Sequence, residues 1–72
     1  MPKRSTYGSQ RRLGRKRRMC GITQHELAHD SGVSLSRIIF AETGRIDLEP
    51  EELARVQNVL RQRAKRAMEA VA

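Results

Sequence analysis

Apolar positions recur at helical spacing along most of this 72-residue chain. From Leu53 onward an apolar side chain or an alanine returns every three or four residues as far as Val71. This pattern predicts one long helix that begins near Pro50, because the amide that proline lacks would have no partner in the first helical turn. No stretch shows the two-residue alternation of a half-buried strand. The chain is therefore predicted to be all-α.

Three shorter helices are predicted before the long one, over residues 9–19, 23–31 and 34–43. Each predicted start has a hydroxyl side chain that can accept a hydrogen bond from a free first-turn amide; these residues are Ser9, Thr23 and Ser34. Each predicted end is followed by a glycine, which takes up the left-handed backbone that stops a helix; these residues are Gly21, Gly32 and Gly44. Thr23 is the strongest start, because Glu26 completes a capping box with it.

Residues 23–44 combine the features that allow two helices to cross steeply over a short turn. Ala28 removes bulk at the crossing, and Gly32 supplies the turn conformation four residues later. A core shared by both helices is predicted for Leu27, Val33, Ile38 and Ala41. The first helix offers a thin inward face made of Leu13, Arg17, Cys20 and, just past its end, Ile22.

The formal net charge of +7 is concentrated at the two ends of the chain. Residues 1–18 carry eight basic side chains and no acid, residues 19–60 carry three basic and seven acidic ones, and residues 61–72 carry four basic and one acidic. A solvated tail that only aids solubility would also be basic. Charge this polarised favours attraction to nucleic-acid phosphate instead, which works by counterion release.

Size and cysteine content limit the remaining options. A chain this short buries only about 60% of its unfolded surface, so we expect one marginally stable domain that a dimer can help. The single cysteine, Cys20, excludes an internal disulfide and fits a reducing cytoplasm. No apolar run suggests a signal peptide or membrane partner. We divide the chain into a flexible basic arm (1–8), a domain (9–60) and a basic continuation of the last helix (61–72).

On particular residues the chain resembles the Cro/CI-like (XRE-like) helix-turn-helix regulators of bacteria, phages and mobile elements. The matching positions are Gly21-Ile-Thr-Gln-His-Glu-Leu-Ala28, Gly32-Val-Ser34, Ile38, Ala41-Glu42, Gly44, Leu53, Val56 and Leu60. The resemblance implies a lambda-repressor-like bundle of four or five helices that binds double-stranded DNA, usually as a homodimer, in the cytoplasm of a bacterial or phage-host cell. In this family a helix usually ends after the position of Leu60 and a fifth helix follows, whereas in this chain the same helix continues.

The resemblance also implies site residues. Gln24 would contact phosphate at the start of the second helix, and Thr43 and Arg45 would contact the DNA backbone at the end of the third. The base-facing positions are Leu35, Ser36, Ile39 and Phe40. Ser36 and Arg37 are the polar neighbours on this side, and Ser34 is also counted among the DNA-binding residues. The cationic backbone contacts from the arm and first helix are expected to be Lys3, Arg4, Arg11 and Arg12.

Arg17 and Glu42 occupy positions that form a partly buried ion pair in the family. The residues themselves favour the same pairing, because an arginine on the thin inward face of the first helix needs a carboxylate partner. Two simply solvated side chains are the alternative.

The expected base-facing side is unusually apolar, since groove readout ordinarily uses hydrogen bonds. We keep three interpretations for Leu35, Ile39 and Phe40. They contact thymine methyl groups, or they bind another protein, or they are covered by the N-terminal arm or a dimer mate.

Two possible chemical sites are set aside. His25 to His29 matches the zinc-protease pattern H-E-x-x-H, but the helix-turn-helix already explains Glu26, and no third ligand follows. Cys20 is more simply a small core residue than a redox sensor. We therefore expect no enzyme activity, metal or cofactor. The predicted function is a sequence-specific DNA-binding regulator, a repressor, with a protein-interaction module (antitoxin-like or adaptor) as the alternative.

Overall fold

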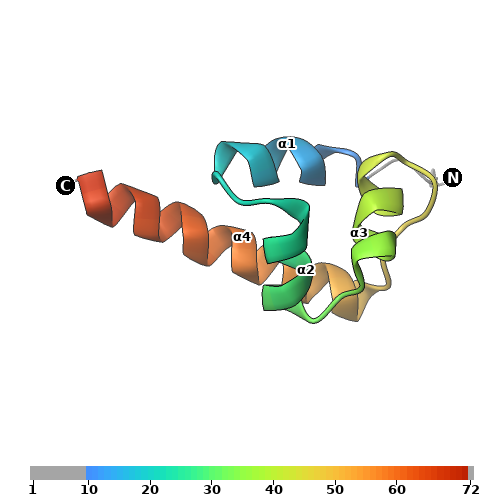
Figure 1. Cartoon of the computed structure of the whole chain (residues 1–72). Helices are drawn as coiled ribbons and strands as arrows, with labels where there is room; N and C mark the ends of the chain where they lie inside the picture. The colour runs from blue at the N-terminus through green and yellow to red at the C-terminus, as the bar shows by residue number, and fades with distance from the viewer. Residues whose placement is uncertain (1–9, 72) are drawn as a thin grey trace, which may run out of the picture.

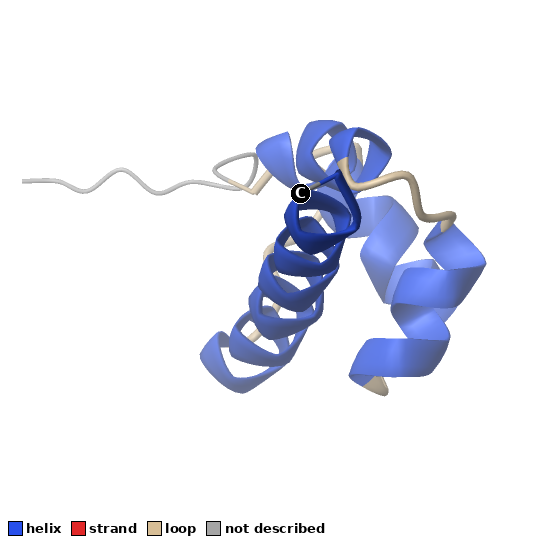
Figure 2. Ribbon diagram, turned by 90° about the vertical axis from the view of Figure 1, so that its left-hand side faces the viewer, coloured by secondary structure: helices blue, strands red, loops and turns tan. Residues whose placement is uncertain are grey.

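The structure, a computed structural model, describes residues 10–71 and contains four helices and no strand in that range (Figure 1). The helices are α1 (Arg12–Met19), α2 (Gln24–Ser31), α3 (Leu35–Glu42) and α4 (Pro50–Val71). Helix α2 packs on α4 and on α3, and α1 packs on α3. The second half of α4 projects beyond the three short helices (Figures 1 and 2). The all-α prediction and the long C-terminal helix are confirmed.

The predicted start of the first helix was wrong. The helix begins at Arg12 rather than Ser9, which lies outside the described residues, and Arg11 precedes it without a side-chain cap. The reason lies in Gln10, whose side chain is bound to the backbone of Leu48 and holds the chain in a turn just before the helix. The third helix is one residue shorter at each end than predicted, because Ser34 and Thr43 are its caps.

The local signals around the second helix are confirmed. The Thr23 hydroxyl accepts a hydrogen bond from the Glu26 amide at 3.0 Å, and the Glu26 carboxylate accepts one from the Thr23 amide at 2.8 Å. Gly32 ends the helix with a φ of 74°. Residues with a Cβ atom adopt this left-handed conformation only at an energetic cost. These two features fix where α2 begins and where the chain turns into α3.

One hydrophobic core lies between the short helices and the first half of α4. Its fully buried members are Leu13, Ile22, Leu27, Val33, Ile38, Ala41, Leu48, Val56 and Leu60. All four side chains predicted for the shared helix-turn-helix core are among them, and Ala28 packs against it half-buried. Leu48, by contrast, lies between the predicted third helix and Pro50, where helical spacing predicts no core position.

Beyond Leu60, no residue of α4 as far as Ala70 is buried, and only Arg63, which pairs with Asp30 of α2, is partly covered. Ala64 and Ala67 continue the apolar stripe but are exposed. Basic side chains surround the stripe in this distal half; they are Arg61, Arg63, Lys65 and Arg66. The unbroken helix that the sequence predicted is confirmed, and half of its length lies outside the core. Within residues 10–71, no helix has the length and apolarity needed to span a membrane.

Candidate nucleic-acid interface

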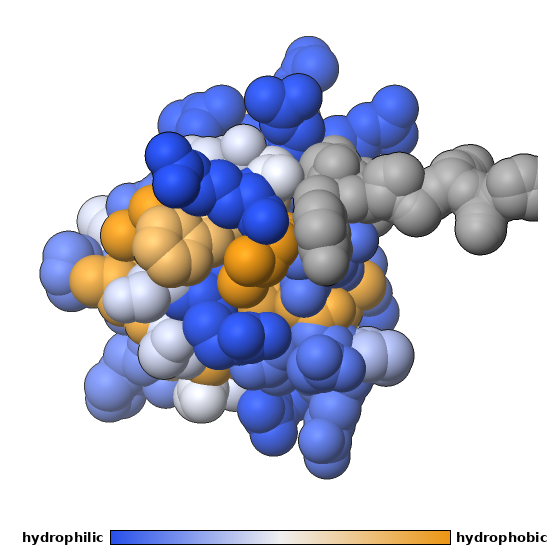
Figure 3. All heavy atoms as spheres, turned by 90° about the vertical axis from the view of Figure 1, so that its right-hand side faces the viewer, coloured by the Kyte–Doolittle hydropathy of each residue, from blue (hydrophilic) through white to orange (hydrophobic). Residues whose placement is uncertain are grey.

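Helix α3 lies on the outside of the bundle and presents one full side to solvent. Ile38 and Ala41 are buried and fix its inner side. Ser36 is exposed on the outer side, and the Phe40 residue is 42% exposed. Figure 3 looks onto the end of the molecule where α3 lies and shows apolar side chains gathered at the surface among hydrophilic ones. As far as residues 10–71 are concerned, this side of α3 is therefore at least partly exposed along its length.

The apolar side chains expected at the base-facing positions differ in exposure. Leu35 and Ile39 are half-buried, while Phe40 is exposed. No described part of the chain covers the three of them fully. The interpretation in which the arm covers them concerns residues 1–8, which lie outside the described part of the structure.

A buried polar cluster connects the three short helices. Arg17 on α1 donates from Nε to Glu42 Oε2 at 2.8 Å and from Nη2 to Oε1 at 3.2 Å, and its Nη1 donates to the Ile22 carbonyl at 2.9 Å. The two side chains are only 11% and 7% exposed. Gln24 on α2 adds a third donor to the Glu42 carboxylate at 3.0 Å. Glu42 at the end of α3 thus accepts hydrogen bonds from both preceding helices.

Arg37, expected among the DNA contacts, is engaged within the protein. Its guanidinium makes a bidentate ion pair with Glu52 on α4, with both N–O distances at 2.8 Å. Glu52 also accepts a hydrogen bond from the Glu49 amide at 2.9 Å. The hydrogen bond from Arg37, followed by that from Glu49, lowers the pKa of Glu52, and Glu52 in turn raises the pKa of Arg37. Arg37 therefore ties α3 to α4.

This pair predicts a loss of stability in acid. Because the pKa of Glu52 is lower in the folded state, the unfolded chain binds more protons, so the contribution is complete above the ordinary value of 4.5 and is lost as pH falls through the lower folded pKa. Denaturant unfolding between pH 7 and pH 3 should show a weaker pH dependence for Glu52→Gln than for the natural chain. Exposed Glu51, changed to glutamine, is the matched control. Equal profiles for both variants would refute this role of Glu52.

The remaining polar positions lie at the two ends of α3. The Ser34 hydroxyl caps the helix by accepting from the Arg37 amide at 3.3 Å. The Thr43 hydroxyl donates to the Phe40 carbonyl at 3.1 Å, and the Arg45 amide donates to the same carbonyl at 2.8 Å. The Arg45 side chain is exposed and has no ion-pair partner among the described residues.

The chain before α1 is anchored beside the end of α3. The Leu48 amide donates to Gln10 Oε1 at 2.7 Å, and Gln10 Nε2 donates to the Leu48 carbonyl at 3.3 Å. The Arg11 side chain lies over Gly44, so close that a Cβ on that glycine would be 2.8 Å from Arg11 Nε. Arg11 and Arg12 are exposed next to this anchor, whereas Lys3 and Arg4 lie outside the described residues. Nothing in the local sequence pattern singles out Gln10.

The histidine pair set aside from the sequence does not converge on a metal site. His29 lies 3.3 Å from the Asp30 carboxylate, and Asp30 also pairs with Arg63 of α4 at 3.0 Å. The hydrogen bond from His29, followed by that from Arg63, lowers the pKa of Asp30. Among the described residues no group of three potential metal ligands comes together.

A short two-helix unit whose second helix is fixed on its inner side and open on its outer side defines the class of DNA-binding helix-turn-helix domains. Comparison with known families matches residues 13–64 to the family described as helix-turn-helix, of the XRE or Cro/CI type, and the chain belongs to this family. No curated protein and no solved structure gave a match. The resemblance inferred from the sequence is confirmed, and the chain is a DNA-binding helix-turn-helix regulator.

Proposed function

We propose that this protein is a sequence-specific transcriptional repressor that places α3 in the DNA major groove and occupies a promoter or operator. The observation that carries the proposal is the outer side of α3, where Ser36 and Phe40 are exposed within the described part of the chain, in a domain that belongs to a DNA-binding family. An α-helix fits the major groove, where each base pair presents a distinct pattern of groups.

Phosphate contacts are proposed at both ends of the unit. Gln24 is at the start of α2, where free amides and the helix dipole favour an anion. Its side-chain amide has two hydrogens, and the bond to Glu42 uses one, which leaves one for a phosphate oxygen. At the other end, Arg45 follows α3 and Arg11 lies over the adjacent Gly44. The Thr43 hydroxyl has one hydrogen, so it would exchange its bond to the Phe40 carbonyl for one to a phosphate oxygen. The Gln24 amide at one end, and the Arg45 and Arg11 cations with the Thr43 hydroxyl at the other, would hold α3 in register.

Base readout is proposed to be mainly apolar. Phe40, with Leu35 and Ile39 beside it on the same helix, would contact thymine methyl groups, and exposed Ser36 would hydrogen-bond a base edge. Arg37 is not assigned to the DNA in this proposal, because its guanidinium is held by Glu52. Such a surface favours A/T-containing sites.

The basic arm and a second copy complete the proposal. Lys3 and Arg4, with Arg11 and Arg12, would neutralise phosphates near the anchored end of the chain. Two copies would read half-sites about 34 Å apart, as helix-turn-helix dimers do.

Selection of bound duplexes from a random pool tests the proposal. We expect an A/T-biased motif repeated with the spacing of one DNA turn. The affinity for the selected duplex should fall steeply with salt, and less steeply for a chain without residues 1–8, because fewer counterions are released. Recovery of no motif above background would refute sequence-specific binding.

A second candidate function rests on the same exposed aromatic. Large exposed apolar groups often mark a protein-binding surface, and Phe40 is one of three large apolar side chains exposed in the described part of the chain. In that case Leu35, Ile39 and Phe40 would hold a protein partner, as in an antitoxin-like or adaptor protein.

A further inference from the structure

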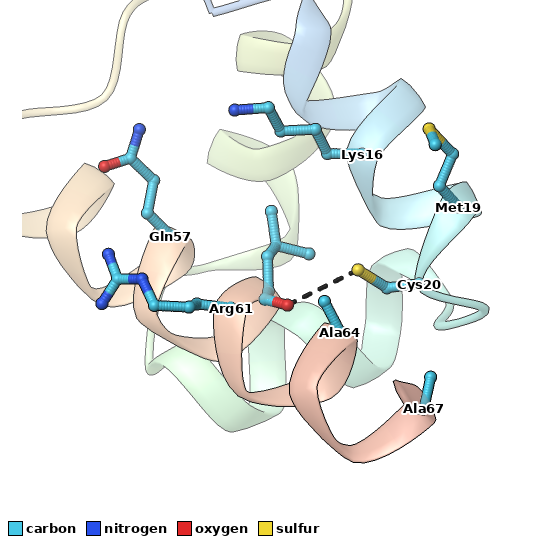
Figure 4. Close-up of a pocket in the computed structure, with 8 residues that line it drawn as sticks. Lys16, Met19, Cys20, Gln57, Arg61, Ala64 and Ala67 are labelled. Atoms are coloured by element: carbon cyan, nitrogen blue, oxygen red, sulfur yellow. Dashed lines mark hydrogen bonds between the residues drawn. The ribbon is translucent and has the colours of Figure 1, made fainter. Parts of the chain in front are cut away.

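A groove lies between α1 and the projecting half of α4, at the end of the molecule away from α3 (Figures 1 and 4). Its volume is about 600 Å³. Figure 4 shows side chains at the end of α1 on one side of the groove and α4 on the other. Between them the Cys20 thiol donates a hydrogen bond to the Leu60 carbonyl. The floor is apolar and is made of Cys20, Leu60, Ala64 and Ala67, and Met19 lines the groove on the α1 side.

The floor is suited to another helix. Ala64 and Ala67 leave the α4 backbone open to close approach, and the Met19 residue is 78% exposed with a side chain that adapts to its partner. From Leu60 to Ala67 the floor runs about 10 Å along the α4 axis. That length matches two turns of a helix lying along the groove.

The charge around the groove has one sign. Lys16 and Arg61 line it together with Gln57, and no aspartate or glutamate does. A smaller hollow of about 170 Å³ continues the same seam between α1 and α4 and adds Arg12, again without an acid. Neither Lys16 nor Arg61 has an ion-pair partner within residues 10–71. The groove therefore combines an apolar floor with unpaired cationic edges.

This charge decides between possible occupants. A second copy in a two-fold contact would bring the same cationic edge against itself, which is unfavourable. A nucleic acid would meet the cations but would bury no apolar surface on the floor. We propose that the groove binds an acidic amphipathic helix of another protein, with leucine-like side chains on the floor and aspartate or glutamate beside Lys16 and Arg61. Because α3 lies at the other end, the regulator could hold DNA and this partner together.

A synthetic peptide serves as the probe: about 18 residues, long enough to form a helix, with leucine at helical spacing and glutamate on both flanks. The full chain is titrated with the peptide, and binding is monitored by fluorescence anisotropy and by the amide resonances of Ala64 and Ala67. Both signals should show saturable binding. Ala64→Glu should weaken it by about tenfold or more, since it places a charge on the floor. A peptide of the same composition in permuted order, and one with lysine for glutamate, should not bind.

Charge variants supply the matched control. Arg61→Glu should weaken peptide binding at least about fivefold. Arg66→Glu makes the same charge change on the same helix but outside the groove, so it should alter peptide binding by less than about twofold. Arg66 lines a different hollow with Asp30 and Arg63. Equal losses in both variants would show attraction by net charge alone and would overturn the proposal.

Four further measurements keep the proposal falsifiable. Thermal unfolding must show each variant folded; if Ala64→Glu unfolds, Ala67→Glu replaces it. Sedimentation measures the oligomeric state. If the natural chain is a dimer and Ala64→Glu is a monomer, the groove binds a second copy and the proposal is overturned. If addition of a DNA duplex shifts the Ala64 and Ala67 resonances, the groove binds nucleic acid and the proposal is likewise overturned. Duplex affinity unchanged by Ala64→Glu would support a groove that works apart from DNA binding.

Discussion

Replacing Arg17 with alanine should lower the stability of the domain by about 3 kcal/mol, because removing one member of a buried pair leaves the other charge without its partner. Glu42, whose side chain is 7% exposed, would keep only Gln24 as a hydrogen-bond donor from a neighbouring helix. The Ile22 carbonyl would also lose its donor. In a domain of this size the melting temperature should fall by roughly 12 °C or more.

Thermal and denaturant unfolding measure this effect, and Arg18→Ala is the matched control. Arg18 is the next residue on α1, carries the same charge and is exposed, so its loss should change stability by no more than about 0.5 kcal/mol. A melting temperature of Arg17→Ala equal to that of the natural chain would show that the pair contributes nothing to the fold.

Phe40→Ala should weaken binding to the selected duplex by roughly 2 kcal/mol, about thirtyfold, because a large apolar contact with DNA is lost. The fold should persist, since the residue is already 42% exposed. The preference for thymine opposite this position should relax at the same time. Met68→Ala removes another exposed apolar side chain on the projecting half of α4 and should leave affinity unchanged.

Replacing thymine by uracil in the duplex makes this test specific, because uracil lacks only the methyl group. When only the thymine opposite position 40 is replaced, the natural chain should lose affinity for the uracil duplex, whereas Phe40→Ala should bind both duplexes alike, which is the signature of a direct contact. If Phe40→Ala leaves DNA binding intact and abolishes a protein complex, the interaction-module function is correct instead.

Most of the scaffold could be predicted from the sequence, because short-range rules determine it. The capping box of Thr23 and Glu26 involves neighbours in one turn, and the φ of Gly32 is a property of that residue alone. The inward positions Leu27 and Ile38 follow from helical periodicity, and both are fully buried. These local rules place the two helices of the motif to within one residue.

The polar contacts of the candidate site could not be predicted in the same way. Arg37 and Glu52 are 15 residues apart, and Gln10 and Leu48 are 38 apart. Neither spacing falls on a helical period, so each contact exists only because the tertiary fold brings the two elements together. Arg37 therefore stood among the expected DNA contacts, although the structure gives it a partner inside the protein.

The carboxylate of Glu42 has a consequence for how this protein meets DNA. It lies at the end of α3 and accepts hydrogen bonds from Arg17 of α1 and Gln24 of α2, so none of the three helices can shift without breaking a buried polar contact. The surface built on α3 is thus a stiff template. In the proposed complex, a binding site that departs from the best sequence would have to bend or twist to fit the protein, at a cost that depends on how easily its base-pair steps deform.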